Sequence, residues 1–298
     1  MASPGASARY PVVVGYDGSS PSEAALQWGS RVAECRGLGL VVVHAAERMT
    51  YAQDAGSGVW KAEDVVADAR EVAGHGRDTV LEKFPDLGVE AVGSLSSAQM
   101  ALGELSTHAS MVVLGSHGRS REGTLLLGST AYAIAGYARC PVVIVRDGAS
   151  ELPGPDRPVV AGVDVSGSSD RAVDAAVAMA REWSAPLLLA TAWLPAPPHQ
   201  HNRGPRGYDS AEDASQAYEG RAQQANQEAL ERVRVAHRSL DVHGTVVEAD
   251  PVEGLIQAAE RGALLVLGAR VHGLAGAVLG STSLGVLHEA TSPIMIVD

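Results

Sequence analysis

A glycine-rich segment at residues 114–130 has the residue types of a phosphate-binding site. It contains the pattern Gly-x-x-Gly, then nine residues, then Gly-Ser. Gly115 and Gly118 have no Cβ, so the backbone beside them can approach a ligand closely. Gly128 and Ser129 are typical of a helix start, where unpaired backbone N–H groups and the helix dipole attract an anion. The spacing therefore predicts an anion site between a strand end and a helix.

Each half of this pattern also has a purely structural interpretation. Glycines form turns, and Gly128 with Ser129 can simply cap a helix. His117 and Arg119, inside the segment, can be solvated loop residues. The phosphate site is favoured because the complete spacing lies between one apolar strand and a helix that leads back to another.

A second candidate is Asp17, which follows the apolar run at residues 11–16. Ligands of open parallel sheets bind beyond the carboxyl ends of the strands, and both Asp17 and Gly115 stand at such ends. The alternative is that Asp17 and Gly18 only form a turn. The positions make Asp17 and Gly115 candidates for the same ligand.

Both motifs recur in the second half of the chain. The run that ends in Gly-x-Asp returns at Asp164, 147 positions after Asp17. The tripeptide Gly-Ser-Thr returns at Gly280, 152 positions after Gly128. Five such landmarks recur in the same order, which indicates that the chain is a duplication.

The length of the chain suits two domains. A chain of 298 residues fits two units of about 150 residues each. The stretch at 148–156 is rich in Gly, Pro and Asp, which is typical of an exposed linker. We predict a first domain at 1–147 and a second domain at 157–298.

Apolar runs alternate with helical patterns in each half. In the first half, we predict strands near 11–16, 39–45, 88–94, 111–115 and 141–146, and helices near 20–36, 59–84, 97–108 and 128–138. In the second half, a helix is expected near 210–239. The strands are continuous Val, Leu and Ile runs, which indicates that both of their faces are covered. The pattern predicts the α/β class, with two tandem, Rossmann-like, doubly wound, five-stranded parallel-sheet domains.

Composition excludes several classes of function. Asp and Glu number 35 against 23 Lys and Arg, so the net charge of −12 disfavours nucleic-acid binding. No apolar run approaches the roughly 18 residues of a membrane span, and the N-terminus has no signal-like segment. Cys35 and Cys140 do not form a disulfide framework. His199 and His201 lie in a Pro-rich stretch without a second ligand cluster, so no metal site is expected. We expect a cytoplasmic protein without membrane or nucleic-acid partners.

The glycine pattern, the strand-end Asp17 and the closing Pro-Val-Val-Ile-Val strand resemble the ATP-binding branch of the universal stress protein family. The tandem arrangement resembles actinobacterial two-domain members. The resemblance implies an adenine nucleotide alpha hydrolase-like fold and ATP as the ligand, with Mg²⁺ as a candidate companion ion. It also implies a regulatory role in stress adaptation and growth restraint.

The resemblance implies a nucleotide site in the first half. Beside the nucleoside and the base it places Gly15, Tyr16, Asp17, Ser19, Ala45 and Leu114. Beside the ribose and phosphates it places Gly115, Gly118, Gly128, Ser129 and Thr130. Ala45 would meet adenine through its backbone, while the preceding His44 is interpreted as a core histidine.

The second half departs from this pattern. Its matching site residues are Asp164, Ser166, Ala192, Leu267, Gly268, Gly280, Ser281 and Thr282. Val271 stands where the second glycine is expected, and the loop is one residue shorter. Gly273 can supply the missing freedom after a register shift, so nucleotide binding by this half stays open.

Two classes of function fit the predicted site. No Gly-x4-Gly-Lys loop supplies a lysine for the terminal phosphates, and no motif fixes a carboxylate for Mg²⁺ or an attacking water. These observations favour a nucleotide-binding regulator. The alternative is a slow ATP hydrolase or an adenylyl-transferring enzyme on the same fold.

The last strand of each half predicts an assembly. Residues 142–145 and 294–297 are apolar, and a final strand leaves an open edge that proteins usually cover or pair. In the family that the chain resembles, such strands pair across a dyad. We therefore expect a pseudo-twofold dimer within one chain and a homodimer of two chains.

Overall fold

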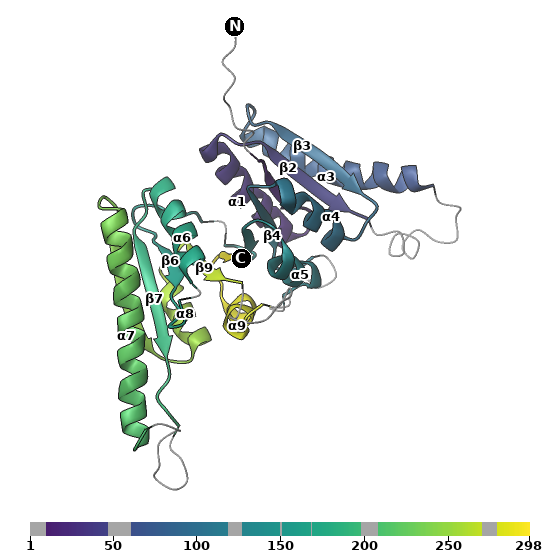
Figure 1. The fold of residues 1–298 in the computed structure, drawn as a ribbon. Helices are drawn as coiled ribbons and strands as arrows, with labels where there is room; N and C mark the ends of the chain where they lie inside the picture. Colours follow the sequence, from purple (N-terminus) through teal and green to yellow (C-terminus); the bar gives the residue numbers. More distant parts are fainter. Residues whose placement is uncertain are drawn as a thin grey trace. The chain divides into compact units, whose positions relative to one another are not determined.

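The computed structural model describes residues 10–46, 61–118, 127–149, 151–167, 169–197, 208–269 and 279–298. The chain divides into two compact units, Met1–Ser150 and Glu151–Asp298. Each unit is a twisted sheet with helices against it (Figure 1). The predicted α/β class, with two tandem units, is confirmed.

Unit 1 alternates strands and helices along the chain. Its elements are β1 (Val12–Gly15), α1 (Ser20–Arg36), β2 (Leu40–Ala45), α3 (Ala62–Lys83), β3 (Val89–Ser94), α4 (Ala98–Leu105), the 3-10 helix η1 (Ser106–His108), β4 (Met111–Gly115), α5 (Ser129–Tyr137) and β5 (Val142–Val145). The strand order is β3-β2-β1-β4-β5, and every neighbouring pair is parallel. This is the doubly wound sheet that the sequence predicts.

Unit 2 repeats this architecture. Its elements are β6 (Val159–Gly162), α6 (Asp170–Glu182), β7 (Leu187–Trp193), α7 (Ala211–Ala236), β8 (Val242–Glu248), α8 (Pro251–Ala259), β9 (Leu264–Gly268), α9 (Ser281–Glu289) and β10 (Ile294–Val297). The order β8-β7-β6-β9-β10, again parallel throughout, matches that of unit 1. The internal repeat of the sequence is therefore a repeat of the fold.

The composition of the elements explains where they form. β1 contains three consecutive valines that are at most 1% exposed, as expected for a strand covered on both faces. α1 begins after Ser19 and carries Pro21 in its first turn, a favoured position because the missing N–H is not needed there. α1 and α3 pack on one face of the sheet, whereas α4 and α5 pack on the other.

The strand order defines the switch point of the sheet. The chain runs from β1 outward through β2 to β3 and then returns to β4 on the other side of β1, so the carboxyl ends of β1 and β4 form the switch point. Open α/β sheets bind ligands at such a point. No helix among the described residues is long and apolar enough to cross a membrane.

Candidate functional site

Asp17 is held in a defined turn beyond β1. Its Oδ1 accepts hydrogen bonds from the backbone N–H of Ser19 at 3.0 Å and from the Ser19 hydroxyl at 2.5 Å. The N–H of Asp17 donates to Oγ of Ser22 at 3.3 Å. Gly18, between Asp17 and Ser19, has a φ of 76°, a backbone conformation that residues with a side chain rarely adopt. Asp17 therefore forms a turn, and this turn also orients its carboxylate.

The other carboxylate oxygen of Asp17 faces the glycine loop after β4. A Cβ on Gly118 would lie 2.6 Å from Oδ2 of Asp17, closer than real Cβ atoms approach. The structure thus brings together two motifs that lie about a hundred positions apart in the sequence. Asp17 and Gly118 form one edge of the switch point.

Gly115 has a structural task that the sequence did not reveal. A Cβ on Gly115 would lie 2.7 Å from the carbonyl carbon and 2.8 Å from the carbonyl oxygen of Pro21. The end of β4 therefore packs directly on the first turn of α1. This contact is sufficient to explain why position 115 is a glycine, whether or not a ligand binds there. The predicted contact of Gly115 with a ligand stays a prediction.

The start of α5 is bonded to the end of β4. The N–H of Gly128 donates to the carbonyl of Ser116 at 2.7 Å, and a Cβ on Gly128 would lie 3.2 Å from Cα of His117. The N-cap residue of α5 is Gly128, which has no side chain to bond the first N–H groups of the helix. Ser129 and Thr130, in its first turn, follow directly, so this helix start has the features of the predicted phosphate site.

Two residues of the apolar side of the predicted site, Gly15 and Leu114, lie in contact. Leu114 is 4% exposed, and a Cβ on Gly15 would lie 2.4 Å from its Cδ2. Ala45 ends β2 and is half-buried. The preceding His44 lies with Nδ1 2.8 Å from the carbonyl oxygen of Tyr16, which fits its interpretation as a core histidine with a partner.

The sequence reasoning missed two neighbours of this site, Ser22 and Glu23. Ser22 bonds the backbone of Asp17, and the hydroxyl of Tyr16 donates to the carboxylate of Glu23. The recurrence of a serine at the matching position, Ser169, was the signal that could have identified Ser22.

Unit 2 contains a related aspartate turn. The N–H of Ser166 donates to Oδ1 of Asp164 at 3.2 Å and its hydroxyl donates to Oδ2 at 2.6 Å. Both carboxylate oxygens therefore accept from this serine, whereas both Ser19 bonds go to Oδ1 of Asp17. The N–H of Asp164 donates to Ser169 at 3.1 Å. The positive φ of 75° in this turn belongs to Gly167, which follows Ser166, whereas Gly18 in unit 1 precedes Ser19. The loop that contains Val271 and Gly273 lies outside the described residues.

The remaining predicted residues of unit 2 lie at the matching strand and helix ends. Leu267 and Gly268 end β9, and the N–H of Gly280 donates to Ala269 at 3.0 Å before α9 begins at Ser281 and Thr282. Ala192, near the end of β7, lies beside Gly254 of α8, where a Cβ would approach it to 2.8 Å. Their contacts with a nucleotide stay predictions.

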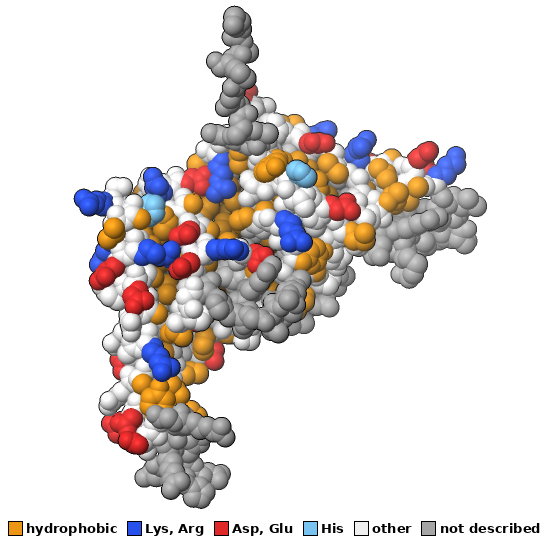
Figure 2. Space-filling model, viewed as in Figure 1, with side chains coloured by type: hydrophobic (Ala, Val, Ile, Leu, Met, Phe, Trp, Pro, Cys, Tyr) orange, Lys and Arg blue, Asp and Glu red, His pale blue; other side chains and the backbone are white. Residues whose placement is uncertain are grey.

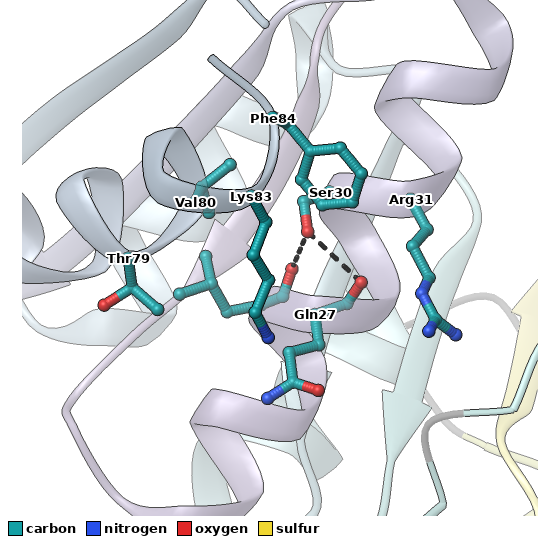
Figure 3. A pocket seen from close by; sticks show the side chains of 8 residues that line it. Gln27, Ser30, Arg31, Thr79, Val80, Lys83 and Phe84 are labelled. Atoms are coloured by element: carbon teal, nitrogen blue, oxygen red, sulfur yellow. Dashed lines mark hydrogen bonds between the residues drawn. The ribbon is translucent and has the colours of Figure 1, made fainter.

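A separate small hollow lies on unit 1 between α1 and the end of α3 (Figure 3). Its volume is about 100 Å³, and it is lined by Leu26, Gln27, Ser30, Arg31, Thr79, Val80, Lys83 and Phe84. The Ser30 hydroxyl is already bonded to the carbonyls of Leu26 at 2.8 Å and Gln27 at 3.2 Å. The hollow lies along the middle of α1, whereas Asp17 precedes this helix, so the two sites are distinct.

The described residues show neither a continuous basic patch on the face drawn in Figure 2 nor a cluster that could hold a metal ion. On the face drawn in Figure 2, acidic and basic side chains are interspersed, without a continuous basic patch among the described residues. Among the same residues, no group of three His, Cys, Asp or Glu side chains could hold a metal ion. His199 and His201 lie outside the part of the chain that the structure describes.

The fold, the aspartate turns and the helix starts define a tandem, doubly wound α/β protein with candidate site residues at the switch point of each unit. The sequence model described as Universal stress protein family matches residues 9–146 and 157–298. The chain belongs to the universal stress protein family and consists of two tandem domains of it.

Known relatives support this assignment over the whole chain. Universal stress protein Rv2005c of Mycobacterium tuberculosis is 30% identical over 300 residues, which cover 96% of each chain. Universal stress protein Rv2623 of the same organism is 28% identical over 302 residues, which cover 96% of this chain and 95% of that protein.

A solved structure shares the fold over nearly the whole chain. A universal stress protein from Archaeoglobus fulgidus aligns with a TM-score of 0.68 and 16% identity, over 96% of this chain and 97% of that one. A universal stress protein described as in complex with cAMP is 31% identical over 49% of this chain and 99% of its own, with a TM-score of 0.37.

Proposed function

We propose that this protein is a nucleotide-binding regulator whose first unit binds ATP at the carboxyl ends of β1 and β4. The observation that carries the proposal is the placement of Asp17. One carboxylate oxygen is bonded to Ser19, and the other faces the glycine loop at Gly118, where a Cβ would stand 2.6 Å away. A hydrogen-bond acceptor of fixed orientation thus stands at the switch point.

Each part of ATP has a matching group in this proposal. The Asp17 carboxylate accepts hydrogen bonds from ribose hydroxyls, because an ionised carboxylate is an acceptor. The first turn of α5, at Gly128 and Ser129, receives the phosphates through backbone N–H groups. The base lies beside Ala45 and Leu114. Mg²⁺ would accompany the triphosphate, since Mg²⁺ in such sites is held largely by substrate phosphates and water.

A regulator is favoured over an enzyme by the groups that the described site contains. Asp17, Ser19 and the glycines bind and orient a ligand, and no lysine of a Gly-x4-Gly-Lys loop is present to act on the terminal phosphates. Slow hydrolysis or adenylyl transfer is the alternative. A single-turnover assay of ADP and AMP formation separates the two classes of function.

Identification of the co-purified nucleotide tests the proposed function. The purified protein is denatured with acid, and the released small molecules are separated and identified. ATP is the expected nucleotide, and added ATP is expected to bind more tightly than cyclic AMP in a competition titration. A preparation that releases no adenine nucleotide and does not bind added ATP contradicts the proposal.

We also propose the assembly that the final strands suggest. β5 ends the sheet of unit 1 and β10 ends that of unit 2 when each unit is considered by itself. Open edges are usually paired or covered, so pairing within the chain and a homodimer of two chains are expected. Sedimentation that detects only a 30.7 kDa species at micromolar concentration contradicts the homodimer.

A further inference from the structure

Tyr16 uses both its side chain and its backbone to join neighbouring elements. Its hydroxyl donates to the carboxylate of Glu23 in the first turn of α1. Its N–H donates to the carbonyl of Val43 at 2.8 Å, and its carbonyl lies 2.8 Å from Nδ1 of His44. Because a carbonyl only accepts, Nδ1 of His44 carries the proton in this bond. Tyr16 is 6% exposed, and its bonds to Glu23 and His44 are partly buried.

The ring of Tyr16 also packs on α3. A Cβ on Gly76 would lie 3.0 Å and 3.1 Å from two ring carbons of Tyr16, and 3.0 Å from Cγ1 of Val42. Such contacts are tighter than most real Cβ contacts, so a side chain at position 76 would require the Tyr16 ring or Val42 to shift by a few tenths of an ångström. Tyr16 thereby connects β1 with β2, α1 and α3.

The residue that follows Tyr16 is Asp17, the central residue of the proposed site. Hydrogen bonds restrain both residues of this peptide. Tyr16 is bonded to Glu23 and His44, and the N–H of Asp17 is bonded to Ser22. A carboxylate binds a ligand best when its orientation is set before binding. The contacts of Tyr16 therefore act on the position of Asp17.

Unit 2 lacks this group of residues. Matching the aspartate turns, the strands and the helix ends aligns Tyr16, Glu23, His44 and Gly76 with Val163, Asp170, Thr191 and Ala229. Valine has no hydroxyl to donate, and the alanine occupies the space that the ring needs.

The matching residues of unit 2 have other partners. Asp170 pairs with Arg232 of α7 at 3.0 Å, and Thr79 stands at the position that matches Arg232 in α3. Oγ1 of Thr191 accepts a hydrogen bond from the Asn226 amide at 3.1 Å. The acidic residue in the first helix turn thus links two helices in unit 2 and holds Tyr16 in unit 1.

We infer that Tyr16, with Glu23 and His44, positions Asp17, and that the first site therefore binds nucleotide more tightly than the second. The inference rests on the proposed function of Asp17. Tyr16 is then a positioning residue that acts through Asp17. The resemblance instead implies that Tyr16 contacts the nucleoside directly.

Calorimetric titration with ATP tests the inference in the full chain carrying Asp164→Ala, which weakens the second site so that the first site dominates the titration. Tyr16→Phe keeps the ring but removes the hydroxyl, and Glu23→Ala removes its acceptor. Each is expected to lower the affinity about fivefold, and the double variant no further, because both remove one bond. Glu23→Gln retains an acceptor oxygen and is expected to bind as the parent does.

Tyr137→Phe is the matched control, because the Tyr137 hydroxyl also donates within unit 1, to the carbonyl of Gln99 at 2.6 Å. It is expected to leave ATP affinity unchanged. A Tyr16→Phe variant that melts earlier but binds ATP like its parent overturns the inference, because the bond is then only structural.

A measurement without nucleotide separates this inference from the proposed function. Amide hydrogen exchange over residues 17–22 is expected to rise in Tyr16→Phe and to stay unchanged in Tyr137→Phe. Unchanged exchange in both variants overturns the positioning role. If exchange rises but the parent protein does not bind ATP, the proposed function fails, and with it the ranking of the two sites.

Discussion

At the scale of single residues, the geometry of Asp17 is compatible with both interpretations that its sequence context leaves open, a turn residue and a proposed ligand contact. It forms a turn with Ser19, and that turn directs its second oxygen toward Gly118. A structural role and a binding role are therefore not alternatives at this position. The consequence is that simple removal of the side chain perturbs stability and binding together, and a more selective substitution is needed.

Asp17→Asn is that substitution. The amide oxygen can still accept from Ser19, whereas the amide nitrogen that replaces Oδ2 cannot accept from a ribose hydroxyl. We expect ATP affinity to fall about tenfold, or about 1.4 kcal/mol, with little change in the melting temperature of the nucleotide-free protein. Asp17→Ala is expected to lower both. If Asp17→Asn binds ATP normally, Asp17 does not contact the nucleoside.

Gly118→Ala tests the approach of the loop to Asp17. The new Cβ would stand 2.6 Å from Oδ2 of Asp17, so the carboxylate or the loop must move. We expect at least about a tenfold loss of ATP affinity, measured by calorimetry. Gly88→Ala is the control, because nothing lies within 4 Å of a Cβ there. Equal affinities of the two variants would contradict the proposed site.

The cysteines give a pH-dependent prediction. Burial raises the pKa of the Cys140 thiol to about 11, whereas Cys35 is exposed. Because the thiolate is the reactive form, Cys140 should become reactive only as the pH rises toward 11. We expect iodoacetamide at about pH 8 to label Cys35 first and both residues equally after denaturation, by mass spectrometry. Equal labelling of the native protein contradicts the expected burial.

At the scale of elements, the sequence predicts the helices and strands of unit 1 to within a few residues. The continuous valine runs and the serine and proline before α1 indicate both the type of element and its start. Contacts between elements do not follow from spacing along one chain. The packing of Gly115 on Pro21 and the bond from Tyr16 to Glu23 depend on which faces meet, so only the folded arrangement reveals them.

Two glycines of α3 allow a matched test of such a contact. A Cβ on Gly74 would meet nothing within 4 Å, whereas one on Gly76 would meet the Tyr16 ring at 3.0 Å. Gly74→Ala should stabilise the protein by up to about 1 kcal/mol through helix propensity alone. Gly76→Ala should lose that gain to overpacking, which typically costs about 1–3 kcal/mol.

Denaturant unfolding of the two variants measures this difference. We expect Gly76→Ala to be less stable than Gly74→Ala and to bind ATP more weakly. The new methyl group displaces the Tyr16 ring, and this displacement disturbs the adjacent residue Asp17. Equal stabilities would contradict the close packing of Tyr16 on α3.

At the scale of the whole molecule, duplication has kept the fold and the pairing of the aspartate with a serine two residues later, but it has changed the details of the turn and what surrounds it. Ser19 bonds one carboxylate oxygen of Asp17, whereas Ser166 bonds both oxygens of Asp164. Val163 also lacks the hydroxyl through which Tyr16 bonds Glu23. Sequence comparison of the halves detects the changed glycine at Val271, because it lies in a motif. It does not reveal that the contacts of Tyr16 are missing around Val163, because those contacts join residues of separate elements. The stretch 148–156 remains our proposed linker.

The central claim is that the first unit binds ATP through Asp17. The most direct test is calorimetric titration of the nucleotide-free full-length chain with ATP, beside the Asp17→Asn variant. The account predicts saturable binding to the parent chain and an affinity about tenfold weaker at the first site of the variant. The absence of saturable binding to the parent chain, or identical titrations of the two proteins, would contradict it.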